Sequence, residues 1–289
     1  MRDIFIEELI TATKKNRNIV LIVNDLGFGV IEKFCKKFPN NYFNAGISEQ
    51  SMIGYAAGLA AAGKHVFVYS IANFPTFRCA EQIRNDVDYH NLPVTIVSVG
   101  AGVGYGNLGY THHALQDYSL MRSFPNTIIL SPGDVMETRS CMRYIVNNPQ
   151  PSYLRLDKSS NFKIHDKLPK VSPGKWLKIF KNNKNKKTTY LTTGTVINHT
   201  IKNFIKKNNF SLYSMPIWGM KSKNKQFSKV NNFKKIITVE DHFQDGGFQS
   251  WLSESTTNRN CKTKIISKTI QPNVIYKVGS KEYLMKYLK

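Results

Sequence analysis

The chain has 289 residues and a formal net charge of +22, and this length suffices for two domains that each bury a core. No apolar run approaches the length that spans a bilayer, and the N-terminus lacks the plan of a signal peptide, so we expect a cytoplasmic protein without a membrane partner. The four cysteines are scattered without metal-ligand spacing, which predicts reduced thiols and no metal site on this chain.

The positive charge is concentrated in the second half of the chain. Residues 1–157 carry 14 Lys and Arg against 13 Asp and Glu, whereas residues 158–289 carry 27 against 6. The lysines of this half lie among asparagines, as in 181–187 and 221–225, without the interleaved aromatic residues that stack on bases. We therefore interpret them as solvated surface and not as a nucleic-acid site.

Helix and strand patterns alternate along residues 1–157. Apolar runs typical of strands buried on both faces occur at 19–23, 65–70 and 94–100, and shorter strands are predicted at 42–44, 127–130 and 153–156. Helices are predicted over 1–17, 31–38, 54–62, 78–89, 115–122 and up to 146, the last capped by Pro132-Gly133-Asp134. This alternation predicts an α/β domain with a mostly parallel sheet.

The composition changes at the end of this domain. Lys, Asn and Pro dominate residues 158–187, which predicts a linker there and a second domain over 188–289. Strands at 188–193 and 236–239 and a helix at 196–207 indicate a smaller α/β unit. The predicted fold is α/β, with two domains that each contain a mostly parallel sheet flanked by helices.

Three polar positions lie where ligands commonly bind in such folds. Glu49 stands at the start of the small-residue helix after a candidate N-cap, Ser48, so it either complements the helix dipole or is a buried acid presented to a ligand. Asp25 follows the strand at 19–23, where it either forms a turn or faces a ligand. His112 ends the glycine-rich loop 100–113, which does not match the dinucleotide fingerprint because its helix opens only later.

Six motifs in order resemble the transketolase family of thiamine-diphosphate enzymes. They are Gly-Ile-Ser-Glu-Gln (46–50), Gly-Leu-Ala-Ala-Ala-Gly (58–63), Glu-Gln-Ile-Arg-Asn-Asp (81–86), Gly-Tyr-Thr-His (109–112), Met-Arg-Ser-Phe-Pro-Asn (121–126) and Ser-Pro-Gly-Asp (131–134). By this resemblance, residues 1–157 are similar to the pyrimidine-binding domain of the family and residues 188–289 to its C-terminal domain. The resemblance covers nearly the whole chain.

The resemblance implies transfer of a two-carbon ketol unit between sugar phosphates, with thiamine diphosphate as the cofactor. Glu49 would be the catalytic acid that hydrogen-bonds the aminopyrimidine ring of the cofactor, favouring the imino form that removes the thiazolium C2 proton. The residues that would line this ring are Ile71, Phe74 and Phe77.

The resemblance also implies substrate ligands. His112 would contact substrate oxygens near the reacting carbon, and Arg155 would bind the phosphate of the sugar. Asp25 would line the site of a neighbouring subunit. Leu108 stands where the family has an aspartate that contacts a sugar hydroxyl. This departure from the family pattern predicts a changed substrate, such as a modified sugar.

The family's magnesium motif, Gly-Asp-Gly followed by Asn, does not occur in the 289 residues. The chain therefore looks like the second subunit of a split transketolase, inactive alone. Its partner subunit would bind Mg²⁺ and the diphosphate, in an A2B2 heterotetramer that also self-associates through the pyrimidine-binding and C-terminal domains. The small residues at 54–62 would let helices of adjoining subunits approach closely, although core packing explains them equally well.

Two alternatives remain open at this point. The chain could be a piece of a deoxyxylulose-phosphate synthase or resemble the β chain of a 2-oxoacid dehydrogenase, but the Thr111-His112 loop and Arg155 favour sugar phosphates. It could also be a non-catalytic scaffold or polyanion-binding protein, as the basic second half and the missing aspartate suggest.

Overall fold

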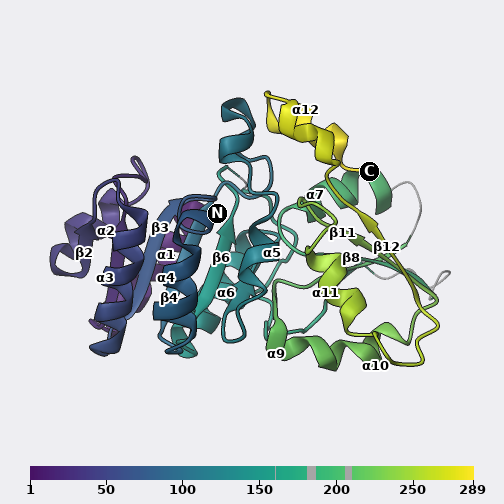
Figure 1. Cartoon of the computed structure of the whole chain (residues 1–289), viewed down its shortest axis with the longest axis horizontal. Helices are drawn as coiled ribbons and strands as arrows, with labels where there is room; N and C mark the ends of the chain where they lie inside the picture. The colour runs from purple at the N-terminus through teal and green to yellow at the C-terminus, as the bar shows by residue number, and fades with distance from the viewer. Residues whose placement is uncertain (160, 181–186, 206–209) are drawn as a thin grey trace.

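A computed structural model describes residues 1–159, 161–180, 187–205 and 210–289. Two β-sheets stand side by side, each with helices against it (Figure 1). Among the described strands, both sheets are parallel except for one strand in each, β10 in the first and β7 in the second. The predicted α/β class with mostly parallel sheets is confirmed. None of the described helices is long and apolar enough to cross a membrane.

The first sheet contains the strands predicted from apolar runs. Its order is β10-β5-β6-β4-β3-β1-β2. The strand bounds are Ile19–Val23 for β1, Tyr42–Asn44 for β2, His65–Ile71 for β3, Val94–Val99 for β4, Ile128–Leu130 for β5, Ser152–Leu156 for β6 and Ile217–Gly219 for β10.

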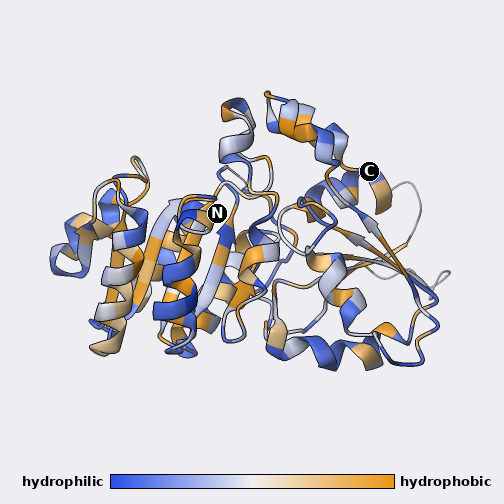
Figure 2. Cartoon of the chain, viewed as in Figure 1, coloured by the Kyte–Doolittle hydropathy of each residue, from blue (hydrophilic) through white to orange (hydrophobic). Residues whose placement is uncertain are grey.

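Helices cover both faces of this sheet. The helix bounds are Arg2–Lys15 for α1, Glu32–Lys37 for α2, Glu49–Ala61 for α3, Ala80–Gln82 for α4 with a π-helical continuation Ile83–Asp88, Asp117–Met121 for α5 and Val135–Asn147 for α6. Val66 and Val68 share a hydrophobic cluster with α3, and Phe67 and Tyr69 share another with α1 and α6. Successive residues of β3 therefore enter opposite cores. Figure 2 shows hydrophobic residues concentrated along these strands, whereas the helices are mixed in colour.

The second sheet has the order β12-β11-β8-β9-β7. The bounds are Leu177–Phe180 for β7, Thr188–Thr192 for β8, Ser211–Ser214 for β9, Lys235–Val239 for β11 and Lys264–Lys268 for β12. Its helices are α7 (Val196–Thr200), α9 (Met220–Lys223), α10 (Phe227–Val230), α11 (Phe248–Glu254) and α12 (Lys281–Leu284). The helix predicted at 196–207 is α7 plus a π-helical turn to Ile205, and residues 206 and 207 lie outside the described part of the chain.

Two strands cross the predicted domain limits. β7 lies within the predicted linker 158–187 and pairs antiparallel with β9, so this part of the linker belongs to the second sheet. β10 lies in the predicted second domain but pairs with β5 of the first sheet, with Trp218 opposite Ile129. Residues 181–186 of the linker lie outside the described residues. The domain limits remain a prediction, but the β10–β5 pairing joins the second part of the chain directly to the first sheet.

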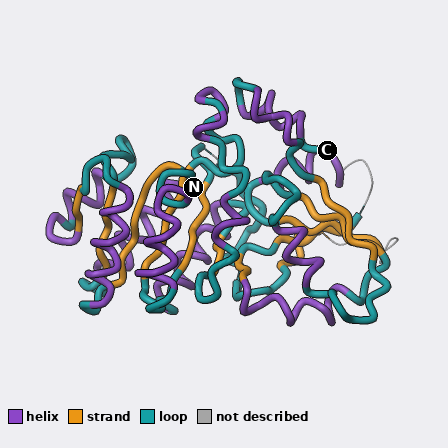
Figure 3. The backbone as a smooth tube through the Cα atoms, viewed as in Figure 1, coloured by secondary structure: helices purple, strands orange, loops and turns teal. Residues whose placement is uncertain are grey.

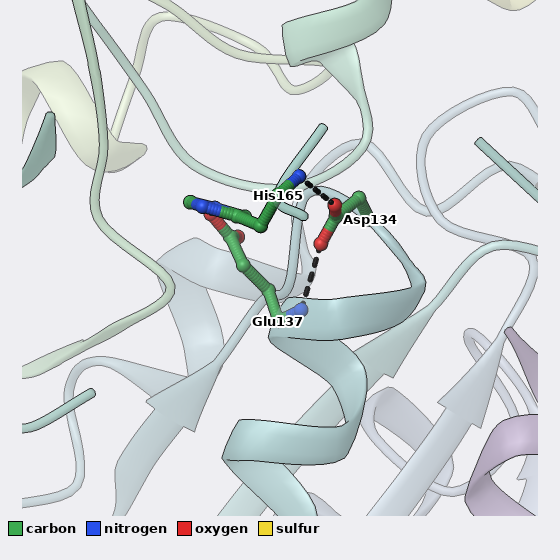
Figure 4. Close-up of side chains that lie close together, drawn as sticks. All are labelled: Asp134, Glu137 and His165. Carbon is green, nitrogen blue, oxygen red and sulfur yellow. Dashed lines mark hydrogen bonds and ion pairs between the residues drawn. The ribbon is translucent and has the colours of Figure 1, made fainter. Parts of the chain in front are cut away.

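The start of α6 fastens part of the predicted linker to the first domain (Figure 4). Asp134 Oδ1 accepts from the Glu137 backbone N–H at 2.7 Å, which confirms the predicted helix cap. Asp134 Oδ2 accepts from the backbone N–H groups of Ile164 and His165, at 2.6 and 3.1 Å. The buried carboxylate of Asp134 thus caps the N-terminus of α6 and holds the segment at Ile164 and His165 against that helix.

Asp134, Glu137 and His165 lie close enough together to suggest a metal site. Their oxygens are already occupied, because Glu137 Oε2 accepts from the Gly133 N–H and the Ser214 hydroxyl, and Glu137 Oε1 is 3.0 Å from His165 Nε2. Burial alone lowers the pKa of His165, but the hydrogen bond and charge of Glu137 raise it overall. We therefore interpret these three residues as a hydrogen-bonded group that holds the segment at His165 to the start of α6, and we propose no metal there.

Replacing Asp134 by Ala is expected to destabilise the fold by about 3 kcal/mol, because a helix cap is lost and three backbone N–H groups lose their acceptor. Urea unfolding monitored by circular dichroism measures the change. The matched control is Asp166→Ala, since Asp166 is exposed, and its effect should stay within about 0.5 kcal/mol. If the two variants were equally stable, the hydrogen bonds of Asp134 would not stabilise the fold as we infer.

Candidate active site

The residues predicted to be functional gather at one edge of the first sheet. The strands β4, β3, β1 and β2 are consecutive and parallel in the sheet, so their carboxyl ends lie along the same edge, where loops bind ligands in open α/β sheets. Figure 3 shows loops crowded along the upper edge of this sheet. Glu49 follows β2, Phe74 follows β3 and His112 follows β4.

Glu49 is the first residue of α3 and is only 3% exposed. Its Oε2 accepts from Arg78 Nη1 at 2.6 Å, so the buried negative charge has a cationic partner. Among the described residues, none donates a hydrogen bond to Oε1. Ser48 occupies the N-cap position, as predicted, but its side chain makes no capping hydrogen bond to the helix, because its hydroxyl donates to the Ala45 carbonyl instead.

Arg78 links Glu49 to an aromatic contact. Its guanidinium carbon lies 4.9 Å from the centroid of the Phe74 ring, and the His112 ring meets Phe74 edge-on at a centroid distance of 5.3 Å. Glu49, Phe74 and His112 are therefore joined by a continuous chain of contacts. Ile71 ends β3 next to this chain, whereas Phe77 is 46% exposed.

His112 has one ring nitrogen engaged and one available. Its Nδ1 lies 2.9 Å from the Thr111 hydroxyl, and no described residue hydrogen-bonds to Nε2. Burial lowers the pKa of His112, so the imidazole is neutral at pH 7. A neutral ring held at Nδ1 can offer Nε2 to a ligand oxygen. The adjacent His113 is fully buried.

The glycine-rich loop brings two further groups near His112. The Tyr105 ring centroid is 6.3 Å from that of His112, and Lys158 Nζ lies 4.6 Å from the centroid of Tyr105. Lys158 comes two residues after β6, so it places a cation at the same edge. Leu108 is 55% exposed on this loop. Sequence reasoning missed Arg78, Tyr105 and Lys158 as site residues, because no spacing relates them to Glu49 or His112.

Asp25 lies at the carboxyl end of β1 and is exposed, with a positive φ of 50°. Its backbone N–H donates to Asn44 Oδ1 at 2.9 Å, and Asn44 Nδ2 donates back to Asp25 Oδ1 at 3.1 Å. No contact is found among the described residues between Asp25 and Glu49 or His112. The structure therefore places Asp25 at the predicted edge but outside the Glu49–His112 contact chain.

Arg155 lies near the carboxyl end of β6, beside β4, but its side chain is engaged inside the protein. Its side chain is fully buried and pairs with Asp117 and Asp241, each at 2.6 Å. The guanidinium also donates to the carbonyl of Ala114 at 2.8 Å and stacks 4.4 Å from the Tyr118 ring centroid. These partners use the donors that would grip a phosphate, so the predicted substrate-binding role does not fit this placement. Arg155 instead joins α5 and β6 to the loop after β11.

Comparison with known proteins agrees with this geometry. The family model described as "Transketolase, pyrimidine binding domain" matches residues 1–162. The chain is 31% identical to a putative transketolase C-terminal section of Methanocaldococcus jannaschii, over 99% of this chain and 91% of that protein. It is also 31% identical to one of the subunits of an apulose-4-phosphate transketolase of Actinobacillus succinogenes, over 88% and 82% of the two chains. A solved split gene transketolase, described as an inactive beta4 tetramer, superposes with a TM-score of 0.83 at 25% identity, over 99% and 92%.

The fold and the matched domain define a protein with a transketolase-type pyrimidine-binding domain. The chain belongs to the transketolase family. It corresponds to the C-terminal subunit of a split transketolase, because it aligns along most of its length with proteins named as such a section or subunit. The predicted family and the prediction of one subunit of a split transferase are confirmed.

Replacing Arg155 by Met is expected to lower stability by about 3–5 kcal/mol, because Asp117 and Asp241 would remain as buried unpaired charges. Arg143→Met is the matched control, since that guanidinium is half exposed beside Glu8 and its loss should cost about 1 kcal/mol or less. Chemical denaturation measures both. If R155M proved as stable as R143M, the buried pairs would not carry the role assigned to Arg155.

Proposed function

We propose that this chain, together with a diphosphate-binding partner subunit, forms a thiamine-diphosphate-dependent transketolase that transfers a two-carbon ketol unit between sugar substrates. The observation that carries the proposal is the buried Glu49 carboxylate. One of its oxygens accepts a hydrogen bond from Arg78, whose guanidinium also lies over the Phe74 ring, and the other oxygen accepts none from the described residues. The family match to a pyrimidine-binding domain supports it.

The donor set fits the aminopyrimidine half of thiamine diphosphate. Glu49 Oε1 is an acceptor available to a protonated ring nitrogen, and Phe74 offers an aromatic face with Ile71 and Phe77 nearby in the same segment. When bound, the cofactor supplies the nucleophilic carbon and the electron sink for ketol transfer. Glu49 would hold the proton at the ring nitrogen, and Arg78 would keep the carboxylate oriented.

Substrate contacts would come from the loops beside Glu49 and Phe74. The neutral His112 would direct Nε2 to a substrate oxygen near the reacting carbon. Lys158 would attract the anionic group of the sugar, because the guanidinium of Arg155 is engaged by Asp117 and Asp241. Asp25 stays assigned to the site of a neighbouring subunit, because its carboxylate is exposed at the same sheet edge.

The substrate is proposed to be a sugar phosphate or a modified sugar. Leu108 is exposed on the glycine-rich loop and offers no hydrogen bond to a sugar hydroxyl. Relatives of this chain are named for apulose-4-phosphate and for 6-deoxy-6-sulfo-D-fructose. Each of these sugars carries an anionic group, which a cation at the position of Lys158 suits.

The outer face of α3 is proposed to dock the partner subunit. Ser51, Gly54, Tyr55 and Gly58 form one exposed helical face, and a Cβ on either glycine would meet open space. The assembly we propose is a cytoplasmic A2B2 heterotetramer, in which the partner holds Mg²⁺ and the diphosphate. We also propose that the chain self-associates through its pyrimidine-binding and C-terminal domains; the description of the matched split transketolase as a beta4 tetramer supports self-association as such.

Glu49→Gln is expected to slow exchange of the cofactor's C2 proton by about 100-fold or more in the reconstituted complex, because an amide cannot take and hold the proton in the same way. Proton NMR after quenching in deuterated buffer measures the exchange without knowledge of the sugar substrate. Glu81→Gln, which makes the same change on an exposed residue, is the control and should exchange at the wild-type rate. Normal exchange in E49Q would overturn the proposed role.

Lys158→Ala is expected to raise the KM for an anionic sugar donor about tenfold, with a smaller change in kcat, because one charged hydrogen bond to the substrate is lost. Steady-state kinetics of the reconstituted complex tests this. Lys163→Ala removes an exposed lysine from the same segment and serves as the control. An unchanged KM in K158A would remove Lys158 from the substrate site.

A further inference from the structure

Asn73 lies between two segments that build the candidate active site. It follows β3, and its side-chain amide contacts the loop that carries His112. The Asn73 Nδ2 group donates to the backbone carbonyl of His113 and, at 3.4 Å, to that of Thr111. These carbonyls belong to the residues on either side of His112. One amide group therefore binds the backbone on both sides of this histidine.

The backbone at Asn73 is itself held in place by hydrogen bonds. The Asn73 carbonyl accepts from the Phe77 N–H at 3.1 Å and from the Thr76 hydroxyl at 3.2 Å. The neighbouring Ala72 N–H donates to the carbonyl of Val99, the last residue of β4, at 2.9 Å. These bonds tie the turn that carries Asn73 to the first sheet, so the sheet determines where the amide lies.

The loop that carries His112 depends on contacts with its neighbours for its shape. Its base is closed by the Ala114 N–H, which donates to the Gly102 carbonyl at 2.7 Å. Between these two residues the described chain contains no α-helix and no strand. Among the described residues, Asn73 is the donor to the two carbonyls beside His112. Loss of its amide would leave both carbonyls without a donor from the protein.

The oxygen of the Asn73 amide shows that donation is what the side chain contributes. Asn73 Oδ1 is buried and accepts no hydrogen bond from the described residues, which is unfavourable. Turning the amide over would place this oxygen against two carbonyl oxygens, so the two donated bonds fix its orientation. A side chain of the same shape without an NH2 group could not replace it.

We propose that Asn73 is a positioning residue that sets the place of His112 relative to the Phe74 ring. The rings of Phe74 and His112 meet edge-on at a centroid distance of 5.3 Å, and Asn73 directly precedes Phe74. The proposal rests on the proposed function, in which Phe74 lines the cofactor and His112 contacts the substrate. A displacement of about 1 Å between such groups can lower a rate about 100-fold.

The first test uses the full chain alone and needs no substrate. NMR titration follows the His112 ring, whose signal is assigned by its loss in His112→Gln. Asn73→Ala is expected to raise the pKa of His112 toward the ordinary value of about 6.5, because burial lowers this pKa and a released loop admits water to the ring. Asn73→Ser keeps one hydroxyl donor and should give a smaller rise.

Asn126→Ala is the matched control. Asn126 is half-buried like Asn73, and its Nδ2 donates to the Asp88 carbonyl at 2.9 Å. This bond lies before β5, at the amino edge of the first sheet, away from the candidate active site. Its loss should lower stability but leave the titration of His112 unchanged. The proposal is overturned if N73A titrates like wild type at His112, or if N126A shifts this pKa as much as N73A does.

The second test measures ketol transfer in the complex reconstituted with the partner subunit. The donors are apulose-4-phosphate and 6-deoxy-6-sulfo-D-fructose, the sugars for which relatives are named. N73A is expected to lower kcat about tenfold or more, while the C2 proton of the cofactor exchanges at close to the wild-type rate, because the contacts of Glu49 are unchanged.

A double-mutant comparison separates positioning from a general structural effect. In a His112→Ala background, Asn73→Ala should lower kcat by less than about twofold, because the group that it positions is gone. An equal loss in both backgrounds would overturn the proposal. C2 proton exchange in E49Q tests the proposed function separately, and the titration of the chain alone decides the role of Asn73 even if neither sugar is turned over.

Discussion

The buried guanidinium of Arg155 is the constraint on which the arrangement of the two sheets depends. It extends from β6 of the first sheet and pairs with Asp117 of α5 and Asp241 after β11. Each carboxylate would be strongly unfavourable in the core without this cation, so the loop after β11 must stay against the first sheet. The bond from Arg155 to the Ala114 carbonyl also fixes the end of the loop that carries His112. The Arg155 guanidinium thus both holds the loop after β11 against the first sheet and fixes the loop that carries His112.

The local sequence predicts the buried strands and the helix cap, because burial pattern and capping depend on residues that are near one another in the chain. The runs that became β1, β3 and β4 are apolar because both faces of these strands are buried, and Asp134 caps α6 as its position after Pro and Gly predicts. β10 is three residues long and owes its place to pairing with β5, which lies far away in the chain. No local pattern encodes such a pairing, and the same is true of β7 within the predicted linker.

The residues of the candidate site also fall into those that the local sequence predicts and those that only the folded chain brings together. Glu49 and His112 could be found because each stands at a junction that the sequence marks, one at a helix start and one at the end of a glycine-rich loop. Burial of Arg155 depends on Asp241, which is remote in sequence, so position alone could not tell a phosphate ligand from a structural ion pair. For the same reason Lys158 was missed, since its nearness to Tyr105 exists only in the folded chain.

The C-terminal segment connects the second sheet to the carboxyl edge of the first. Its last residues pair with the chain after β12, where the Thr269 N–H donates to the Lys289 carbonyl at 3.1 Å. Lys281 of α12 pairs with Asp157, which follows β6, and two residues earlier the Gly279 N–H donates to the Gly106 carbonyl at 3.1 Å. Gly106 belongs to the loop that leads to His112, and a Cβ there would lie 2.5 Å from the Gly279 oxygen. A Cβ at position 106 would lie equally close to Leu284 Cδ1 of α12, so any larger residue would push α12 away from the loop. Glycine at position 106 is therefore what allows α12 to pack against the loop that leads to His112.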